Sequence, residues 1–279
     1  MRTRREFLAV GAAGLPMLGA TASMGTMPSA TNARPRLAVL ASAYHYLSHA
    51  YHIAGRFLDG FVVPGSGEPL HRPACEVASL FIEQTPENDL GKAKAHRHGV
   101  RLSPTIADAL TLGTGKLAVD GVLLIGEHGD YPSNDKLQKL YPRGPFFREA
   151  IRVIAGAKRP IPIFIDKHLS YSRVEALQMV EDARGLGIPL MAGSSLPVTW
   201  RLPAIEPPIG SKFRDVIVAS RGEIEIFGFH ALETLQCIAE RRDRAGKPQG
   251  VVAVTCLSGE DVWKAGDAGR WSWDLLAKA

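Results

Sequence analysis

Apolar residues recur along this sequence in two alternating patterns. Short runs that are apolar almost throughout lie at residues 37–41, 77–82, 121–125, 161–165 and 189–192, and they predict strands buried on both faces. Between these runs, apolar residues recur at spacings of three and four, which predicts helices at residues 49–58, 89–98, 105–112, 146–155 and 171–185. Ser170 or Ser172 could cap the last helix. The alternation predicts an α/β fold, in which a Rossmann-like parallel sheet carries helices on both faces.

The pattern changes after residue 198. Prolines crowd residues 197–208, and a helix at 230–241 and a strand at 251–256 follow the run at 215–220. We interpret residues 199–279 as the start of a second, α+β domain for substrate binding or oligomerisation, behind a Rossmann-like domain at 34–198. We expect this second domain to be incomplete, because the sequence stops at Ala279 within an amphipathic stretch and without a closing strand.

The first residues have the order of features that marks an export signal. Arg4 and Arg5 precede an apolar run at 7–19, which is too short for a stable membrane anchor. Small residues near Ala22 offer a cleavage site, and Ala33 is the alternative. Because the start resembles the twin-arginine consensus, we expect residues 1–33 to be a signal peptide and linker, and the twin-arginine translocon to carry a folded bacterial protein to the periplasm. The alternative is a basic amphipathic tail.

Composition narrows the classes of function. A formal charge of +5 over 279 residues, with no basic stripe and no interleaved aromatic residues, gives no reason to expect a nucleic-acid partner. The three cysteines, Cys75, Cys237 and Cys256, are odd in number and have no C-x-x-C spacing, so neither a zinc knuckle nor a disulfide scaffold is predicted. We expect a small-molecule substrate rather than a nucleic acid, and the sequence leaves a homo-oligomer open.

Polar residues follow the predicted strands at the places where a ligand would bind. In an open parallel sheet, ligands bind outside the carboxyl ends of the strands. The residues that follow these ends are Ser42, Tyr44, His45, His49, Glu83, Glu127, His128, Gly129, Asp130, Tyr131, Asp166, Lys167, His168, Gly193, Ser194 and Ser195. Because a lysine flanked by an acid and a histidine suits proton transfer, Asp166, Lys167 and His168 are the strongest catalytic candidates.

Three histidines suggest a different chemistry. His45, His49 and His52 have a spacing that would put them on one face of a helix, and two histidines four residues apart can share a metal ion. His128 and Asp130 would have to complete such a site. A non-redox hydrolase or lyase that uses His45, His49, His128 and Asp130, with or without a metal, is therefore one alternative.

Three stretches resemble the Gfo/Idh/MocA oxidoreductase family, which pairs a Rossmann domain with an α/β substrate domain. They are HGVRLSPTIADAL at 98–110 with the strand after it, IPIFIDKHL at 161–169 with the helix and strand after it, and FGFHALE at 227–233. Together they lie within residues 36–240. The resemblance implies hydride transfer between NAD or NADP and a sugar, a sugar acid or a cyclitol, with Lys167 and His230 as acid and base and with Asp166 and His168 beside them.

The resemblance also implies a nicotinamide site at the ends of the first, second and fourth strands. Its candidate residues are Ser42, His45, Glu83, Gly126 and His128. The family's glycine-rich loop is absent, however, because the first strand is followed by ASAYHY at 41–46, and each β-carbon there would obstruct the pyrophosphate. A relative that lost nucleotide binding and serves as a binding protein is thus a further alternative.

Overall fold

The computed structural model describes residues 33–193, 196, 199, 201–242 and 250–279. The predicted signal peptide and linker at 1–33, except for residue 33, and the serines at 194 and 195 lie outside these described residues. By its contacts, the chain from Arg34 onward belongs to one unit. No helix among the described residues is both long and apolar enough to cross a membrane.

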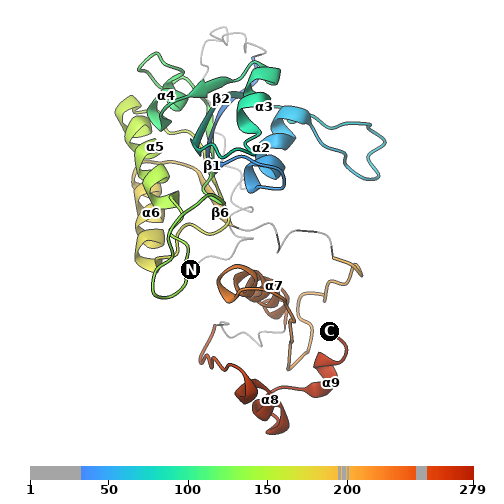
Figure 1. Cartoon of the computed structure of the whole chain (residues 1–279). Coiled ribbons are helices and arrows are strands. Elements are labelled where there is room, and N and C mark those ends of the chain that lie inside the picture. Colours follow the sequence, from blue (N-terminus) through green and yellow to red (C-terminus); the bar gives the residue numbers. More distant parts are fainter. Residues whose placement is uncertain (1–32, 194–195, 197–198, 200, 243–249) are drawn as a thin grey trace, which may run out of the picture. The chain divides into compact units, whose positions relative to one another are not determined.

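A six-stranded parallel sheet forms the centre of residues 34–193 (Figure 1). Its strands are β1 (Arg36–Ala43), β2 (Glu76–Gln84), β3 (Arg101–Ser103), β4 (Gly121–Ile125), β5 (Ile163–Asp166) and β6 (Leu190–Gly193). They stand in the order β3-β2-β1-β4-β5-β6, so the direction of winding reverses between β1 and β4. This order is that of a Rossmann-like fold, which confirms the predicted α/β class.

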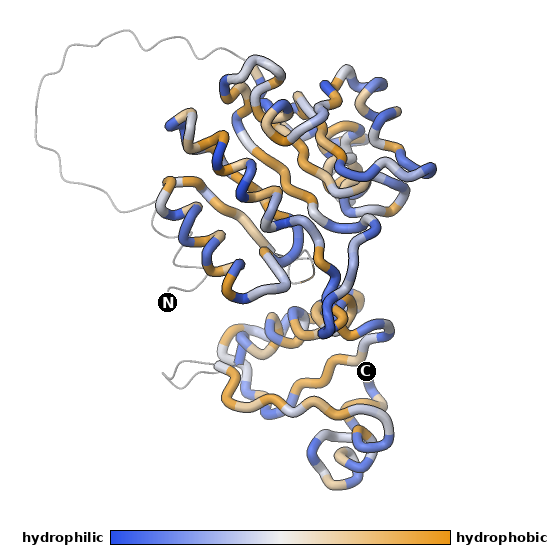
Figure 2. Tube along the Cα trace, turned by 60° about the vertical axis from the view of Figure 1, so that its left-hand side comes forward, coloured by the Kyte–Doolittle hydropathy of each residue, from blue (hydrophilic) through white to orange (hydrophobic). Residues whose placement is uncertain are grey.

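Helices cover both faces of this sheet. They are α2 (His49–Asp59), α3 (Gly91–His98), α4 (Ile106–Thr111), α5 (Arg143–Ala157) and α6 (Arg173–Gly185), close to the predicted positions. Residues of α2 and α3 pack with Val39 and Leu80 in one buried cluster, whereas residues of α4, α5 and α6 pack with Leu40 and Leu124 in another. Each central strand therefore contributes alternate side chains to two cores, as its continuous apolar run predicts, and Figure 2 shows these strands in the hydrophobic colour.

Side-chain caps fix where the helices of the sheet begin. The hydroxyl of Ser172 accepts a hydrogen bond from the backbone N–H of Glu175, so Ser172 rather than Ser170 caps α6. Ser48 caps α2 in the same way through the N–H of Tyr51. Because α2 starts only at His49, His45 precedes the helix, and the prediction that His45, His49 and His52 share one helix face is wrong.

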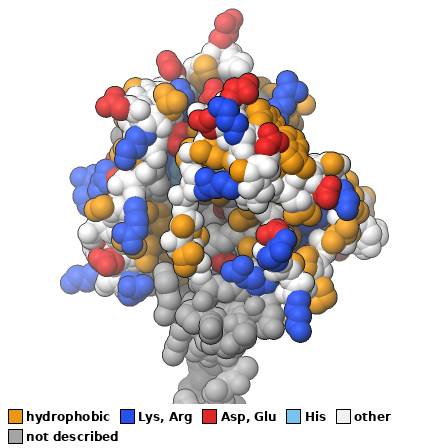
Figure 3. Space-filling model, turned by 90° about the horizontal axis from the view of Figure 1, so that it is seen from below, with side chains coloured by type: hydrophobic (Ala, Val, Ile, Leu, Met, Phe, Trp, Pro, Cys, Tyr) orange, Lys and Arg blue, Asp and Glu red, His pale blue; other side chains and the backbone are white. Residues whose placement is uncertain are grey.

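The region after Gly193 has helices but little core. A π-helical turn (Ile224–Gly228) leads into α7 (Phe229–Ala239), and α8 (Glu260–Asp267) and α9 (Trp273–Leu276) follow. The predicted strand at 251–256 is wrong, since these residues form no helix or strand in the structure. Among the described residues of this region, Ala265 is the only buried hydrophobic side chain, and Val252 is fully exposed. Figure 3, a view from below, shows apolar side chains at the surface among charged ones.

Candidate active site

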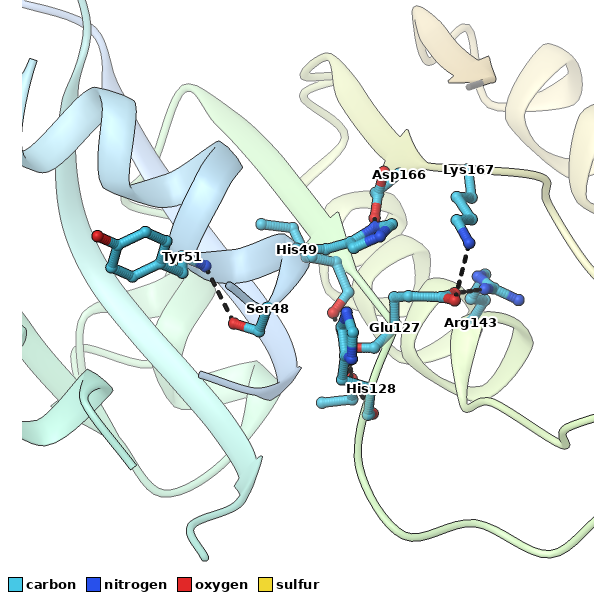
Figure 4. A network of polar contacts seen from close by, with 10 residues as sticks. Ser48, His49, Tyr51, Glu127, His128, Arg143, Asp166 and Lys167 are labelled. Atoms are coloured by element: carbon cyan, nitrogen blue, oxygen red, sulfur yellow. Dashed lines mark hydrogen bonds and ion pairs between the residues drawn. The ribbon is translucent and has the colours of Figure 1, made fainter. Parts of the chain in front are cut away.

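The candidate site lies at the carboxyl ends of β1, β4 and β5. The reversal of winding between β1 and β4 is where an open α/β sheet leaves room for a ligand. The loops that follow these three strands bring together the imidazole, carboxylate, ammonium and guanidinium groups drawn in Figure 4. Most of these groups were predicted from their positions after the strands, and the structure adds how they are paired.

His49 and Asp166 form the most exposed pair of the site. His49 is the first residue of α2, Asp166 is the last residue of β5, and their Nδ1 and Oδ2 atoms lie 2.5 Å apart (Figure 4). The side chain of His49 is 27% exposed and that of Asp166 only 10%. In the neutral ring, Nδ1–H donates a hydrogen bond to the carboxylate, and the other ring nitrogen, Nε2, carries the lone pair. This arrangement suits a base that is oriented by an acid.

Glu127 is the centre of a buried ion cluster. Its Oε1 accepts a hydrogen bond from the Nζ of Lys167 at 3.1 Å, and its Oε2 accepts one from the Nη2 of Arg143. All three side chains are less than a tenth exposed. Burial by itself raises the pKa of Glu127, but the charges of Arg143 and Lys167 outweigh it and hold that pKa below its ordinary value. Glu127 is therefore ionised at neutral pH.

Backbone strain is concentrated at two residues of this site. His128 has a φ of +70° and Lys167 one of +60°, in the left-handed region that residues with a β-carbon seldom adopt. The buried hydroxyl of Ser42, in β1, lies 2.8 Å from the carbonyl oxygen of Glu127 and 2.9 Å from that of His128, and it donates to them. Contacts of this kind hold the strained loop after β4 in place, as is common at functional sites.

Three imidazole rings lie in edge-to-face contact near the end of β1. The ring of His128 lies edge-on to the rings of His45 and His49, with centroids 5.2 and 5.0 Å away. Burial, followed by the charge of His49, lowers the pKa of His128 to about 4. Burial, followed by the charge of Arg143, likewise lowers the pKa of His168 to about 4. Both rings are thus neutral at pH 7, and His128 Nε2 and His168 Nδ1 are buried with no partner among the described residues.

A metal site is not formed by these residues. Among the residues that the structure describes, no group of three or more histidine, cysteine, aspartate or glutamate side chains has a geometry that could hold a metal ion. Asp130, which was expected to complete the shell, is exposed, and its backbone is instead bound by Gln84 through hydrogen bonds of 2.8 and 3.1 Å. His45, His49 and His128 therefore offer imidazole nitrogens for hydrogen bonding rather than a set of metal ligands.

A dinucleotide in the usual pose does not fit the loop after β1. That pose needs free backbone N–H groups at the start of α2 and no β-carbons near the pyrophosphate. Here the N–H groups of His45 and Tyr51 both donate to the hydroxyl of Ser48, at 3.2 and 3.1 Å. The side chain of Tyr44 is completely buried in the same loop. The cap at Ser48 thus takes the N–H of Tyr51, and the loop has no glycine that would let a pyrophosphate approach the backbone.

The other candidate cofactor residues also have partners within the protein. Glu83 accepts a hydrogen bond from the hydroxyl of Tyr131. At Gly126, a β-carbon would lie 2.8 Å from the Cγ of Arg143, so glycine is needed here for the packing of that arginine. Ser42 is buried and bound to the loop after β4. The predicted cofactor roles of these residues stay predictions.

His230 lies in α7, outside the sheet. Its Nδ1 is 3.4 Å from Oε2 of Glu233, one helical turn further on. The contacts described for Lys167 are with Glu127 and with Gly193 and do not include His230. The sequence placed Glu127 among the polar residues after a strand end but gave it no role, and it did not single out Arg143. Gly126 was a signal for Arg143, because a glycine beside a strand end can mark a close neighbour.

Comparisons with known proteins find only distant structural similarity. No protein-family model and no curated protein matches the sequence. Similar solved structures include a UDP-N-acetylglucosamine 3-dehydrogenase from Acidithiobacillus ferrooxidans, which is 14% identical over 58% of this chain and 38% of that chain, with a TM-score of 0.37. A biliverdin reductase from Synechocystis, solved with biliverdin and NADP+, is 14% identical over 57% and 38%, with a TM-score of 0.35.

A third similar structure is a Gfo/Idh/MocA family oxidoreductase from Vibrio cholerae, which is 17% identical over 58% of this chain and 39% of that chain, with a TM-score of 0.37. This is the family that the three sequence stretches resemble. The chain spans less than two fifths of the length of each of these three structures. A likeness this slight carries no argument about activity, and the fold assignment rests on the strand order of the chain itself.

Proposed function

We propose that this chain is an enzyme that moves protons to and from a hydroxylated small molecule at the carboxyl edge of its sheet. The observation that carries the proposal is the His49–Asp166 pair, 2.5 Å apart and at the switch point. A carboxylate that fixes the tautomer of an imidazole leaves Nε2 as a base, which is the arrangement of many acid–base enzymes. The strained backbone at Lys167, the residue after Asp166, supports a catalytic role for the same loop.

Each group has a role in this chemistry. His49 Nε2 takes a proton from the carbon beside a carbonyl group of the substrate, which leaves an enolate, and then returns a proton to that carbon. Asp166 stabilises the imidazolium that forms. The ammonium group of Lys167, which Glu127 holds at 3.1 Å, stabilises negative charge that develops on the substrate oxygen. His128, neutral at pH 7, contributes a hydrogen bond without adding charge.

The test follows, by NMR in deuterated water, the exchange of the carbon-bound proton beside the carbonyl group in sugars and sugar acids. The exchange rate of the His49→Ala variant should fall by a factor of about 10² to 10⁴, the usual contribution of a positioned base. His52→Ala is the matched control, because His52 lies on the same helix but is exposed and should leave the rate unchanged. An undiminished rate in His49→Ala would refute the proposal.

NAD(P)-dependent hydride transfer is the second candidate. Two observations favour it, namely the Rossmann-like strand order and the position of Lys167 directly after β5, where the sequence resembles the oxidoreductases. Lys167 and His230 would then act as acid and base on a sugar, a sugar acid or a cyclitol. Because the loop after β1 does not fit the usual dinucleotide pose, a thermal shift on adding NAD or NADP is the deciding measurement. Substrate binding with neither proton exchange nor a cofactor shift would favour a binding protein.

We also propose that the chain is exported to the periplasm through the twin-arginine translocon. The support is the sequence at Arg4 and Arg5, with the apolar run and the small residues that follow. In a bacterial host, the double substitution Arg4→Lys and Arg5→Lys should retain the uncleaved chain in the cytoplasm. Equal amounts of the wild type and this variant in the periplasmic fraction would contradict the proposal.

A further inference from the structure

Arg143 is the most deeply buried charged residue among those that the structure describes. It is the first residue of α5, and its side chain is only 2% exposed. Gly126 leaves space for it, and the ring centroid of Tyr141 lies 5.1 Å from the guanidinium carbon in a cation–π contact. A side chain with so little exposed surface is not one that a substrate meets. Any influence of Arg143 on the chemistry therefore passes through its neighbours.

The neighbour that connects Arg143 to the site is Glu127. The two oxygens of its carboxylate accept from different cations, Oε2 from Arg143 Nη2 and Oε1 from Lys167 Nζ (Figure 4). The contact with Arg143 therefore limits the rotation of the carboxylate and keeps Oε1 directed at Lys167. Glu127 comes from the loop after β4 and Arg143 from α5, whereas Lys167 follows β5. The ammonium group is thus held by two elements other than its own.

The charge of Arg143 also affects where a shared proton lies. A buried glutamate and a buried lysine can neutralise each other if a proton moves from Nζ to the carboxylate, because burial disfavours both charged forms. Arg143 opposes this transfer, since its own contact is with the carboxylate of Glu127 and is strongest while that carboxylate is charged. Burial raises the pKa of Glu127, and the charge of Arg143 is the strongest of the influences that lower it. The proton therefore stays on Lys167.

We infer that Arg143 is a positioning residue of the reaction, which keeps Glu127 ionised and oriented so that Lys167 presents a charged ammonium group to the developing enolate. This inference rests on the proposed function, because it concerns the role given there to Lys167. It goes beyond that function in assigning to the reaction a residue that no substrate contacts. The alternative is a purely structural role, in which Arg143 fills the space beside Gly126.

The experiment compares Arg143→Met with the wild type in the proton-exchange assay. Methionine keeps much of the buried volume but removes the guanidinium group, and denaturant titration establishes that the variant is folded under the assay conditions. We expect kcat for exchange to fall by a factor of about 10 to 100, the effect of a slightly misplaced catalytic group, while KM hardly changes. Arg143→Lys, which keeps the charge, should recover part of the rate.

Arg148→Met is the matched control for the arginine variants. Arg148 lies on the same helix and also pairs with a glutamate, Glu175, at 2.7 Å, but its side chain is 55% exposed. Its substitution should leave both kcat and KM unchanged. A wild-type kcat in folded Arg143→Met would overturn the inference.

A double-mutant cycle with Lys167→Met separates positioning from structure. Lys167→Met alone should lower kcat by a factor of about 10² to 10³, as the loss of a group that stabilises the enolate. If Arg143 acts through Lys167, adding Arg143→Met to Lys167→Met should lower the rate by no more than about two-fold. Losses that multiply would overturn the inference, because Arg143 would then act by another route. If Arg143→Met does not fold, Arg143→Gln, which keeps a hydrogen-bond donor but no charge, enters the same cycle.

The NMR signal of the Lys167 ammonium group gives a readout that needs no substrate. In a protein with isotope-labelled lysine, Lys167→Arg identifies this signal by removing it. Arg143→Met should shift the signal or broaden it, because the carboxylate that holds the ammonium group loses its own orientation, and Arg148→Met should leave the signal in place. An unchanged Lys167 signal in Arg143→Met would overturn the inference.

The variant His49→Ala separates this inference from the proposed function. If His49→Ala exchanges protons at the wild-type rate, the function is wrong, and the ammonium signal alone decides whether Arg143 positions Lys167. If His49→Ala and Lys167→Met both lose exchange while Arg143→Met keeps it, the function stands and the inference is the part that fails.

Discussion

The two parts of the described chain differ in how well they bury their apolar residues. In residues 34–193, strands such as β1 and β4 are buried over almost their whole length between two layers of helices. In residues 201–242 and 250–279, Leu202 and Val252 are exposed, and α7 has no buried residue. Both parts contain apolar runs of similar character, so the difference lies in whether a run finds neighbours to pair with.

An apolar run with strand-like composition is therefore not sufficient to form a strand. Residues 121–125 and residues 251–256 are both short and almost entirely apolar. The first run lies between β1 and β5, which supply its backbone hydrogen bonds, and it forms a strand with the predicted bounds. The second run has no such neighbours among the described residues and stays irregular. Residues with a high β propensity form a strand only where a neighbouring strand can pair with them.

The largest effect expected from this comparison concerns two phenylalanines. Phe147, in α5, is fully buried, whereas Phe227 is 46% exposed. Phe147→Ala should lower the free energy of unfolding by about 4 kcal/mol, because it removes buried surface and leaves a cavity. Phe227→Ala should change it by less than about 1 kcal/mol. Denaturant titration measures both values, and equal effects would mean that the two regions are packed alike.

The second effect concerns two glutamates that each contact two cations. Glu127 is buried with Arg143 and Lys167, whereas Glu206, with Arg201 and Arg241, is 55% exposed. Glu127→Gln should cost about 3 kcal/mol, because it leaves two buried cations without a counter-charge. Glu206→Gln should cost less than about 1 kcal/mol. Denaturant titration at neutral pH separates the two, and a small effect at Glu127 would contradict the ionised buried cluster.

The pH dependence of the free energy of unfolding tests the same buried ion cluster. Because the pKa of Glu127 is held below its ordinary value of 4.5, its stabilising contribution is fully present above pH 4.5 and is lost as the pH falls through the lowered pKa. The difference between the wild type and Glu127→Gln should therefore narrow below pH 4.5. A constant difference down to pH 3 would indicate a packing effect rather than a charge effect.

A pH-dependent effect is expected from the two neutral histidines of the site. The pKa values of His128 and His168 are lowered from 6.5 to about 4, so between these values the unfolded chain binds protons that the folded chain does not. Stability should fall as the pH decreases from 6.5 to 4.5, before the carboxylates titrate. His128→Asn, which tolerates the left-handed backbone, should flatten this slope, and so should His168→Asn. A slope that survives both substitutions would assign the effect to groups outside the sheet edge.

The fold was predictable because its signals are local and agree with one another. The apolar run of β4, the cap at Ser172 and the alternation of elements all point to a parallel sheet. The positions of Asp166, Lys167 and His128 at the sheet edge follow from the same topology. His49 was predicted to be near them, but its pairing with Asp166, 117 positions away in sequence, is visible only in the structure.

The remaining features depend on long-range contacts that a sequence pattern does not contain. Arg143 looks like a surface residue at the start of a helix, and its burial depends on Gly126, which leaves space for it. His45 has the spacing of a helical residue, but the hydroxyl of Ser48 caps α2 after it and excludes it from the helix. Residues 251–256 are apolar, as a strand would require, but no strand among the described residues pairs with them, and they stay irregular.

The hydroxyl of Ser42 links the first strand to the loop that carries Glu127 and His128. It is the point at which β1 is fastened to the loop that carries Glu127 and His128, with contacts of 2.8 and 2.9 Å. Backbone pairing joins β1 to β4 only as far as Ile125, so this hydroxyl extends the connection into the loop beyond the strand. Ser42→Ala would remove that donor from two buried carbonyl groups, and the loop that carries the carboxylate partner of Lys167 would then be free to shift, which makes Ser42 a natural position for enlarging the site.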